Sequence, residues 1–144
     1  MSAPELHLTR MVPAPVEDVY RAWTDPEVLM RWWGPRNSTM RSAEIDARAG
    51  GTYRFEMVGT SGAPTVITGE YVDVDPPHRL SFTWRFESGG PGPQESHVTV
   101  ELWPAGDGTE LVLTHGGFPD TEVAAPYGDG WAYVLPRLAA LFDQ

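Results

Sequence analysis

Apolar and polar residues alternate along about seven short stretches of the chain, which is the pattern of strands that bury one face. In the clearest stretch, 80–86, Leu80, Phe82, Trp84 and Phe86 alternate with polar residues. The remaining stretches are 6–12, 43–46, 53–57, 65–74, 97–103 and 110–115. Glycine- and proline-rich segments separate most of them, including 59–64, 75–78, 87–94 and 104–109, so the pattern predicts consecutive antiparallel hairpins.

The register of the stretch 65–74 is ambiguous, because apolar residues fall on both of its faces. Gly69 in its middle predicts a β-bulge. Glu70 would face the interior only if that bulge turns the even-numbered positions inward.

Two short helices are expected between the first two strands. The apolar residues of 16–23 recur every three and four positions, and Pro15 suits the first position of such a helix. Asp25 as a cap and Pro26 in the first turn predict a second helix, which runs to about Trp32 and stops at Gly34-Pro35.

The longest helix is predicted from Thr121 to the end of the chain. Its broad apolar stripe consists of Trp131, Val134, Leu135, Leu138, Leu141 and Phe142. Pro126, Gly128 and Gly130 should fray its first half, and Pro136 should bend the second. An antiparallel sheet with one apolar face covered by this helix makes the predicted fold class α+β.

A series of short motifs runs along nearly the whole chain. In order, they are Ala14-Pro15, Val19-Tyr20, Ala22-Trp23-Thr24-Asp25-Pro26, Arg31-Trp32-Trp33-Gly34-Pro35, Asp46, Arg48, Gly50-Gly51, Pro76-Pro77, Arg79-Leu80, Phe82-Thr83-Trp84, Gly108-Thr109, Leu111, Leu113, His115, Gly117-Phe118 and Gly130-Trp131. In residues and order, this series resembles the START-like, helix-grip superfamily, also called SRPBCC. Within the superfamily it resembles the family of the C-terminal domain of the activator of heat-shock protein 90 ATPase.

The resemblance implies one START-like domain over residues 1–144, in which a curved antiparallel sheet of about seven strands grips the C-terminal helix. It also implies a cavity between the sheet and this helix. Members of the superfamily bind lipid-like, aromatic or polyketide-like small molecules. Fold alone does not fix chemistry, however, so the site has to be argued from residues.

Three of the six tryptophans of the chain, Trp23, Trp32 and Trp33, lie in or beside the two short helices. Helices of about two turns need large apolar anchors to be stable, and a buried aromatic ring provides about 150–250 Å² of contact. Trp23 is expected in the core. Trp32 and Trp33 would differ by about 100° around a helix, so one should anchor it and the other face the cavity.

The expected cavity wall combines inward aromatic and apolar positions of strands and helices, which are common in ligand pockets. Its candidate ligand-binding residues are Trp32, Trp33, Tyr53, Phe55, Met57, Phe82, Trp84, His115, Trp131 and Leu135. The alternative is that these side chains fill a solid core. The leading hypothesis is a protein that binds a small, largely hydrophobic or aromatic molecule.

Candidate catalytic chemistry is sparse, and no catalytic residue is assigned. His115 lies on an apolar strand face, where a hydrogen-bonded core histidine is the common case. A polyketide cyclase- or hydrolase-like enzyme that uses the same cavity stays open, with His115 and an inward Glu70 as its acid–base pair. The four histidines lack metal-ligand spacing, and no nucleotide motif is found, so neither a metal nor a cofactor is expected.

Net charge, apolar content and the lack of cysteine limit the kinds of binding partner and the cellular location expected for this chain. The formal net charge of −10 disfavours nucleic acid and anionic membranes, and no apolar run is long enough to insert into a membrane. The lack of cysteine and of a leader pattern predicts a cytoplasmic location. A homodimer through surface aromatic residues and a role as chaperone co-regulator stay open, although the chain lacks the separate N-terminal domain of the chaperone activator.

Overall fold

The computed structural model describes residues 5–34, 38–59, 62, 64–88 and 95–142. Its strands are β1 (Leu6–Val12), β2 (Ser38–Ile45), β3 (Thr52–Gly59), β4 (Pro64–Asp75), β5 (Arg79–Ser88), β6 (Ser96–Ala105) and β7 (Gly108–Gly116). Its helices are α1 (Val16–Thr24), α2 (Pro26–Trp32) and α3 (Thr121–Leu141). The expected loops at 59–64 and 87–94, and Pro35, lie mostly outside these residues.

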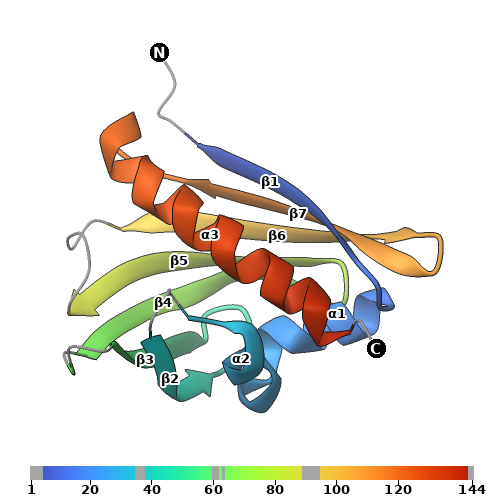
Figure 1. Cartoon of the computed structure of the whole chain (residues 1–144), viewed down its shortest axis with the longest axis horizontal. Helices are drawn as coiled ribbons and strands as arrows, with labels where there is room; N and C mark the ends of the chain where they lie inside the picture. The colour runs from blue at the N-terminus through green and yellow to red at the C-terminus, as the bar shows by residue number, and fades with distance from the viewer. Residues whose placement is uncertain (1–4, 35–37, 60–61, 63, 89–94, 143–144) are drawn as a thin grey trace.

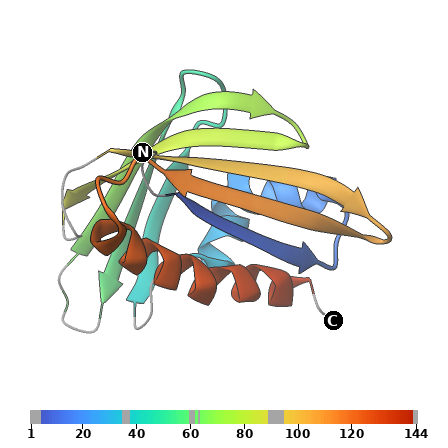
Figure 2. The same ribbon diagram turned by 90° about the horizontal axis from the view of Figure 1, so that it is seen from above.

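The strands form one antiparallel sheet in the order β1-β7-β6-β5-β4-β3-β2 (Figure 1). The sheet curves, and α3 lies along its concave side (Figure 2). The two short helices α1 and α2 connect the edge strand β1 to the opposite edge strand β2. The predicted α+β helix-grip fold is therefore confirmed.

The two short helices begin largely as their sequence predicts. Asp25 caps α2, because its side chain accepts a hydrogen bond from the Glu27 backbone N–H at 3.0 Å. Pro26 occupies the first turn of α2, as expected. Pro15 is instead the residue before α1, whose first helical residue is Val16.

The predicted fraying of α3 is wrong, because the helix is continuous through Pro126 and Pro136. Asp120 caps it, accepting from the Val123 backbone N–H at 2.9 Å. The side chains that face the sheet are buried every three or four residues: Ala124, Tyr127, Trp131, Val134, Leu135 and Leu138. Packing of this face outweighs the hydrogen bond that Pro126 removes.

The predicted bulge at Gly69 is also wrong. The β4–β5 register shifts between Val66 and Ile67 and again between Tyr71 and Asp73, but it is regular around Gly69. Glycine is required here by a close approach instead: a Cβ atom at this position would lie 2.0 Å from the Thr83 carbonyl oxygen and 2.5 Å from the Tyr53 ring. The Tyr53 hydroxyl donates to that same carbonyl.

We expect Gly69→Ala to lower the free energy of unfolding by about 1–3 kcal/mol or more, because the added methyl group displaces backbone and a packed ring. Urea unfolding followed by tryptophan fluorescence measures the loss. Gly130→Ala is the matched control, since a Cβ atom there meets nothing within 4 Å. In a helix this control should gain about 0.5–1 kcal/mol, and equal effects of the two substitutions would contradict the packing explanation.

Candidate functional site

Trp32 and Trp33 have different roles, as predicted, and the structure shows which is which. Trp32, the last residue of α2, is 0% exposed, and its Nε1 donates to the Ala22 carbonyl oxygen at 3.0 Å. That carbonyl lies in the last turn of α1, where backbone oxygens lack partners within the helix. Trp32 therefore anchors α2 to α1.

Trp33 lies just beyond the end of α2 in an extended conformation, with φ −81° and ψ 145°. Its indole projects between the sheet and α3. The ring centroids of Phe55, Trp84 and Trp131 lie 5.3, 5.5 and 5.3 Å from that of Trp33. Trp33 thus separates the packed interior around Phe55 from a cavity on its other side.

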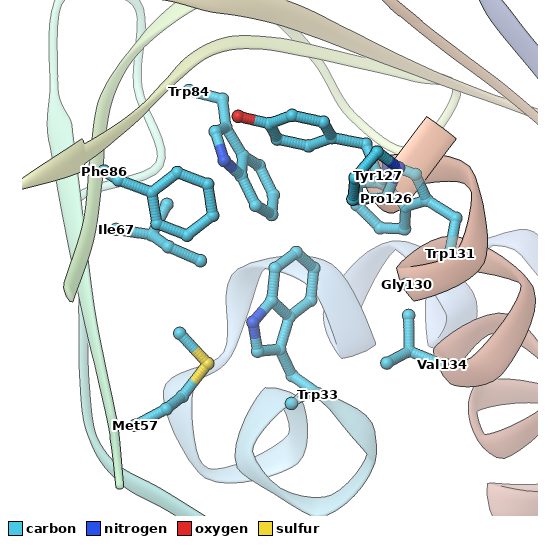
Figure 3. A pocket seen from close by; sticks show the side chains of 11 residues that line it. Trp33, Met57, Ile67, Trp84, Phe86, Pro126, Tyr127, Gly130, Trp131 and Val134 are labelled. Atoms are coloured by element: carbon cyan, nitrogen blue, oxygen red, sulfur yellow. The ribbon is translucent and has the colours of Figure 1, made fainter. Parts of the chain in front are cut away.

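The cavity has a volume of about 150 Å³ and lies where β3 and β5 end and β4 begins, opposite the first half of α3. Figure 3 shows Phe86, Ile67 and Met57 on one side of it and Trp131 and Val134 on the other. Its lining residues are Trp33, Gly34, Met57, Ile67, Trp84, Phe86, Pro126, Tyr127, Gly130, Trp131 and Val134. None of these side chains carries a formal charge.

A β-bulge lies at this end of the sheet. Ile67 and Phe86 are register partners, and the register shifts by one residue immediately beyond them. Bulges bend a strand and redirect its side chains. Both partners line the cavity, so the shift lies where the sheet and α3 leave the space between them unfilled.

His115 lies behind the cavity wall and is 0% exposed. Trp131 Nε1 donates to His115 Nδ1 at 2.9 Å, and His115 Nε2 lies 2.7 Å from the Ser96 hydroxyl. An indole N–H can only donate, so Nδ1 must be the unprotonated nitrogen and Nε2 must carry the proton that Ser96 accepts. Ser96 in turn donates to the Trp84 carbonyl oxygen at 3.5 Å.

This network fixes His115 in its neutral form. Burial lowers the pKa of His115 from 6.5 to about 3, with a smaller contribution from the charge of His97. Both ring nitrogens are occupied, and the imidazole faces no solvent. His115 therefore holds the Trp131 indole in the cavity wall and does not present a free base to the cavity.

Glu70 does not join His115. Its side chain is exposed, and its backbone N–H donates to the Thr83 hydroxyl at 2.9 Å. The acid–base pair considered from sequence is therefore not formed. Among the residues that the structure describes, no cluster of three or more metal-ligating side chains is found. None of the described helices has the length and apolar character needed to cross a membrane.

Residues 13–143 match the family model described as "Activator of Hsp90 ATPase homolog 1-like protein". The match covers nearly the whole chain. The chain belongs to this family. No curated protein matches it.

Solved structures of similar proteins agree with the family membership. Protein CV1439 from Chromobacterium violaceum is 33% identical, with a TM-score of 0.87 over 97% of this chain and 98% of that one. The AHSA1 protein SPO3351 from Silicibacter pomeroyi is 28% identical, with a TM-score of 0.84 and the same coverage. DynU16, from the dynemicin biosynthetic locus, is 28% identical with a TM-score of 0.75, and this chain covers 47% of its length.

Ten residues were expected from the sequence to form the cavity wall. Four of them line the cavity in the structure: Trp33, Met57, Trp84 and Trp131. The others lie in the packed interior: Trp32, Tyr53, Phe55, Phe82, His115 and Leu135. Tyr53, Phe55 and Phe82 share an inward strand face with the lining residues but lie farther along it, against the rings of Tyr71 and one another.

Sequence reasoning missed several lining residues: Gly34, Ile67, Phe86, Pro126, Tyr127, Gly130 and Val134. Two of these carried a usable signal. Phe86 continues the alternation of Phe82 and Trp84, and Tyr127 lies four positions before Trp131, one helical turn earlier on the same face. Tyr127 lies in the half of the helix that was predicted to fray, outside the predicted apolar stripe.

Proposed function

We propose that this protein binds one small, largely apolar molecule in the cavity between β3–β5 and α3. The observation that carries the proposal is the space of about 150 Å³ that the surrounding rings leave unfilled. Protein interiors are otherwise close-packed, and an apolar cavity of this size favours an apolar guest over water. Burial of the guest against aromatic faces provides the binding free energy.

A cyclase- or hydrolase-like reaction in this cavity has less support. Proton transfer requires a positioned acid or base, but His115 is engaged through both nitrogens and Glu70 faces solvent. DynU16 shares the fold and is encoded in a biosynthetic locus, which is the observation that favours this second candidate function. The lining itself favours binding.

We expect Val134→Phe to weaken binding strongly, because the larger ring projects from α3 into the cavity that Val134 lines. Toluene serves as the probe, and titration calorimetry or ligand-observed NMR measures its affinity. The dissociation constant should rise at least about tenfold, while the urea midpoint should be retained because the new ring fills existing space.

Ala132→Phe is the matched control for this substitution. Ala132 is exposed on the same helix, so its added ring should leave toluene binding unchanged. Undiminished toluene binding by Val134→Phe would place the guest elsewhere, and an absence of toluene binding by the unmodified protein would refute the proposed function.

A further inference from the structure

The lining of the cavity restricts the guest in size and charge. An engineered protein cavity of about 150 Å³ takes up benzene, so the space of about 150 Å³ here fits one ring with a small substituent. A charged guest would lose its hydration without gaining an ionic partner from the lining. Five aromatic side chains surround the space, and their faces and edges favour another aromatic ring: Trp33, Trp84, Phe86, Tyr127 and Trp131.

One hydrogen-bond donor in the cavity wall, the indole nitrogen of Trp84, has no acceptor among the described residues. Trp84 is 6% exposed and lines the cavity, and its Nε1 is shielded from solvent with no hydrogen-bond partner among the described residues. An indole N–H is a donor only. Burying it without an acceptor lowers stability, so a native structure that does so calls for an explanation.

Other buried indoles of this chain show the contrast. Trp32 Nε1 donates to the Ala22 carbonyl oxygen, and Trp131 Nε1 donates to His115. Trp23 Nε1 is also buried without a partner, but Trp23 does not line the cavity. Trp84 therefore combines a buried, unpaired donor with a position at the binding space.

Phe86 also lines the cavity, and its ring lies beside this donor. Figure 3 shows the Trp84 nitrogen on the side of its indole that faces Phe86. The two ring centroids lie 6.0 Å apart in an edge-to-face arrangement. An aromatic face is a weak acceptor compared with an oxygen atom. Phe86 is only partly buried, so packing does not enclose its ring completely, and a guest oxygen that binds Nε1 requires this ring to move aside.

We infer that the preferred guest is a neutral molecule with a single aromatic ring and one hydrogen-bond acceptor, which accepts from Trp84 Nε1. An aryl ether or aryl ketone oxygen has the required chemistry. The inference rests on the proposed function, since it specifies what the same cavity selects.

Anisole and ethylbenzene form a matched pair of probes, because they have nearly the same shape and only anisole carries an acceptor oxygen. We expect anisole to bind about threefold to tenfold more tightly, the gain typical of one net hydrogen bond. In proton NMR spectra, the Trp84 indole N–H signal should move downfield with anisole but not with ethylbenzene. The exposed Trp103 indole should not move with either probe.

Trp84→Phe removes the donor, and in this variant the preference for anisole should vanish. The spectra of the unmodified protein test the inference even if that variant folds poorly. Equal affinity for both probes, or tighter binding of benzoate than of anisole, would overturn the inference and leave the proposed function standing. If neither probe binds and toluene also fails, the inference and the proposed function fall together.

Discussion

Replacement of Trp32 by alanine is expected to lower the free energy of unfolding by about 3–5 kcal/mol, the range for deleting a buried aromatic side chain. Trp32 is 0% exposed, and its ring centroid lies 4.8 Å from that of Trp23 and 5.5 Å from that of Trp33. The substitution also leaves the Ala22 carbonyl oxygen without the donor that it has at the end of α1. Small domains have free energies of unfolding of only about 5–15 kcal/mol, so the variant would lose a large share of its stability.

Urea unfolding monitored by circular dichroism measures this loss. The control is Trp103→Ala, since Trp103 is 54% exposed and its truncation should change stability by no more than about 0.5 kcal/mol. Trp32→Phe should give an intermediate loss, because it keeps most of the buried area but lacks the N–H donor. A loss for Trp32→Ala no larger than that for Trp103→Ala would show that Trp32 is not the anchor.

Acidification should destabilise the protein through His115. The folded state keeps His115 neutral with a pKa of about 3, whereas the unfolded chain protonates it near 6.5. Between these values the unfolded state binds more protons, so stability is full above about pH 6.5 and falls as the pH is lowered. Each pH unit is worth about 1.4 kcal/mol, so the loss due to His115 between pH 7.5 and 4.5 should be about 2–3 kcal/mol.

Unfolding free energies at several pH values, compared between the unmodified protein and His115→Gln, isolate this contribution. The variant lacks the imidazole, so its stability should fall less steeply over the same range. Leu113→Val, two residues away and also fully buried, should lower stability equally at every pH. Parallel curves for the unmodified protein and His115→Gln would mean that His115 is not held neutral.

The fold was predictable because alternation and helical spacing mark each main element separately. The alternation of Leu80, Phe82 and Trp84 predicts which face of β5 is buried, and Asp25-Pro26 indicates where α2 begins. The start of α3 was harder, because local propensity at Pro126 argues against helix whereas the buried side chain of Tyr127 stabilises it. Tertiary packing outweighs local helix propensity here, and a local sequence pattern does not show which tertiary contacts a residue will make.

The cavity was only partly predictable. A period of two shows that Phe82 and Trp84 both face inward, but not that Phe82 meets packed rings while Trp84 meets open space. That difference depends on how closely α3 approaches each part of the sheet. The choice between Trp32 and Trp33 depends on where α2 ends, since the helical angle between them does not apply once Trp33 is extended.

β1 pairs with β7, with Leu6 opposite His115, so the first strand of the chain obtains its cross-strand hydrogen bonds from the last strand. During synthesis, β1 emerges long before its partner and must remain without cross-strand hydrogen bonds until β7 has left the ribosome. Such long-range closure slows folding and exposes an unpaired edge to other nascent chains. A translation pause or truncation before residue 108 would therefore leave β1 without its partner strand and prone to aggregation.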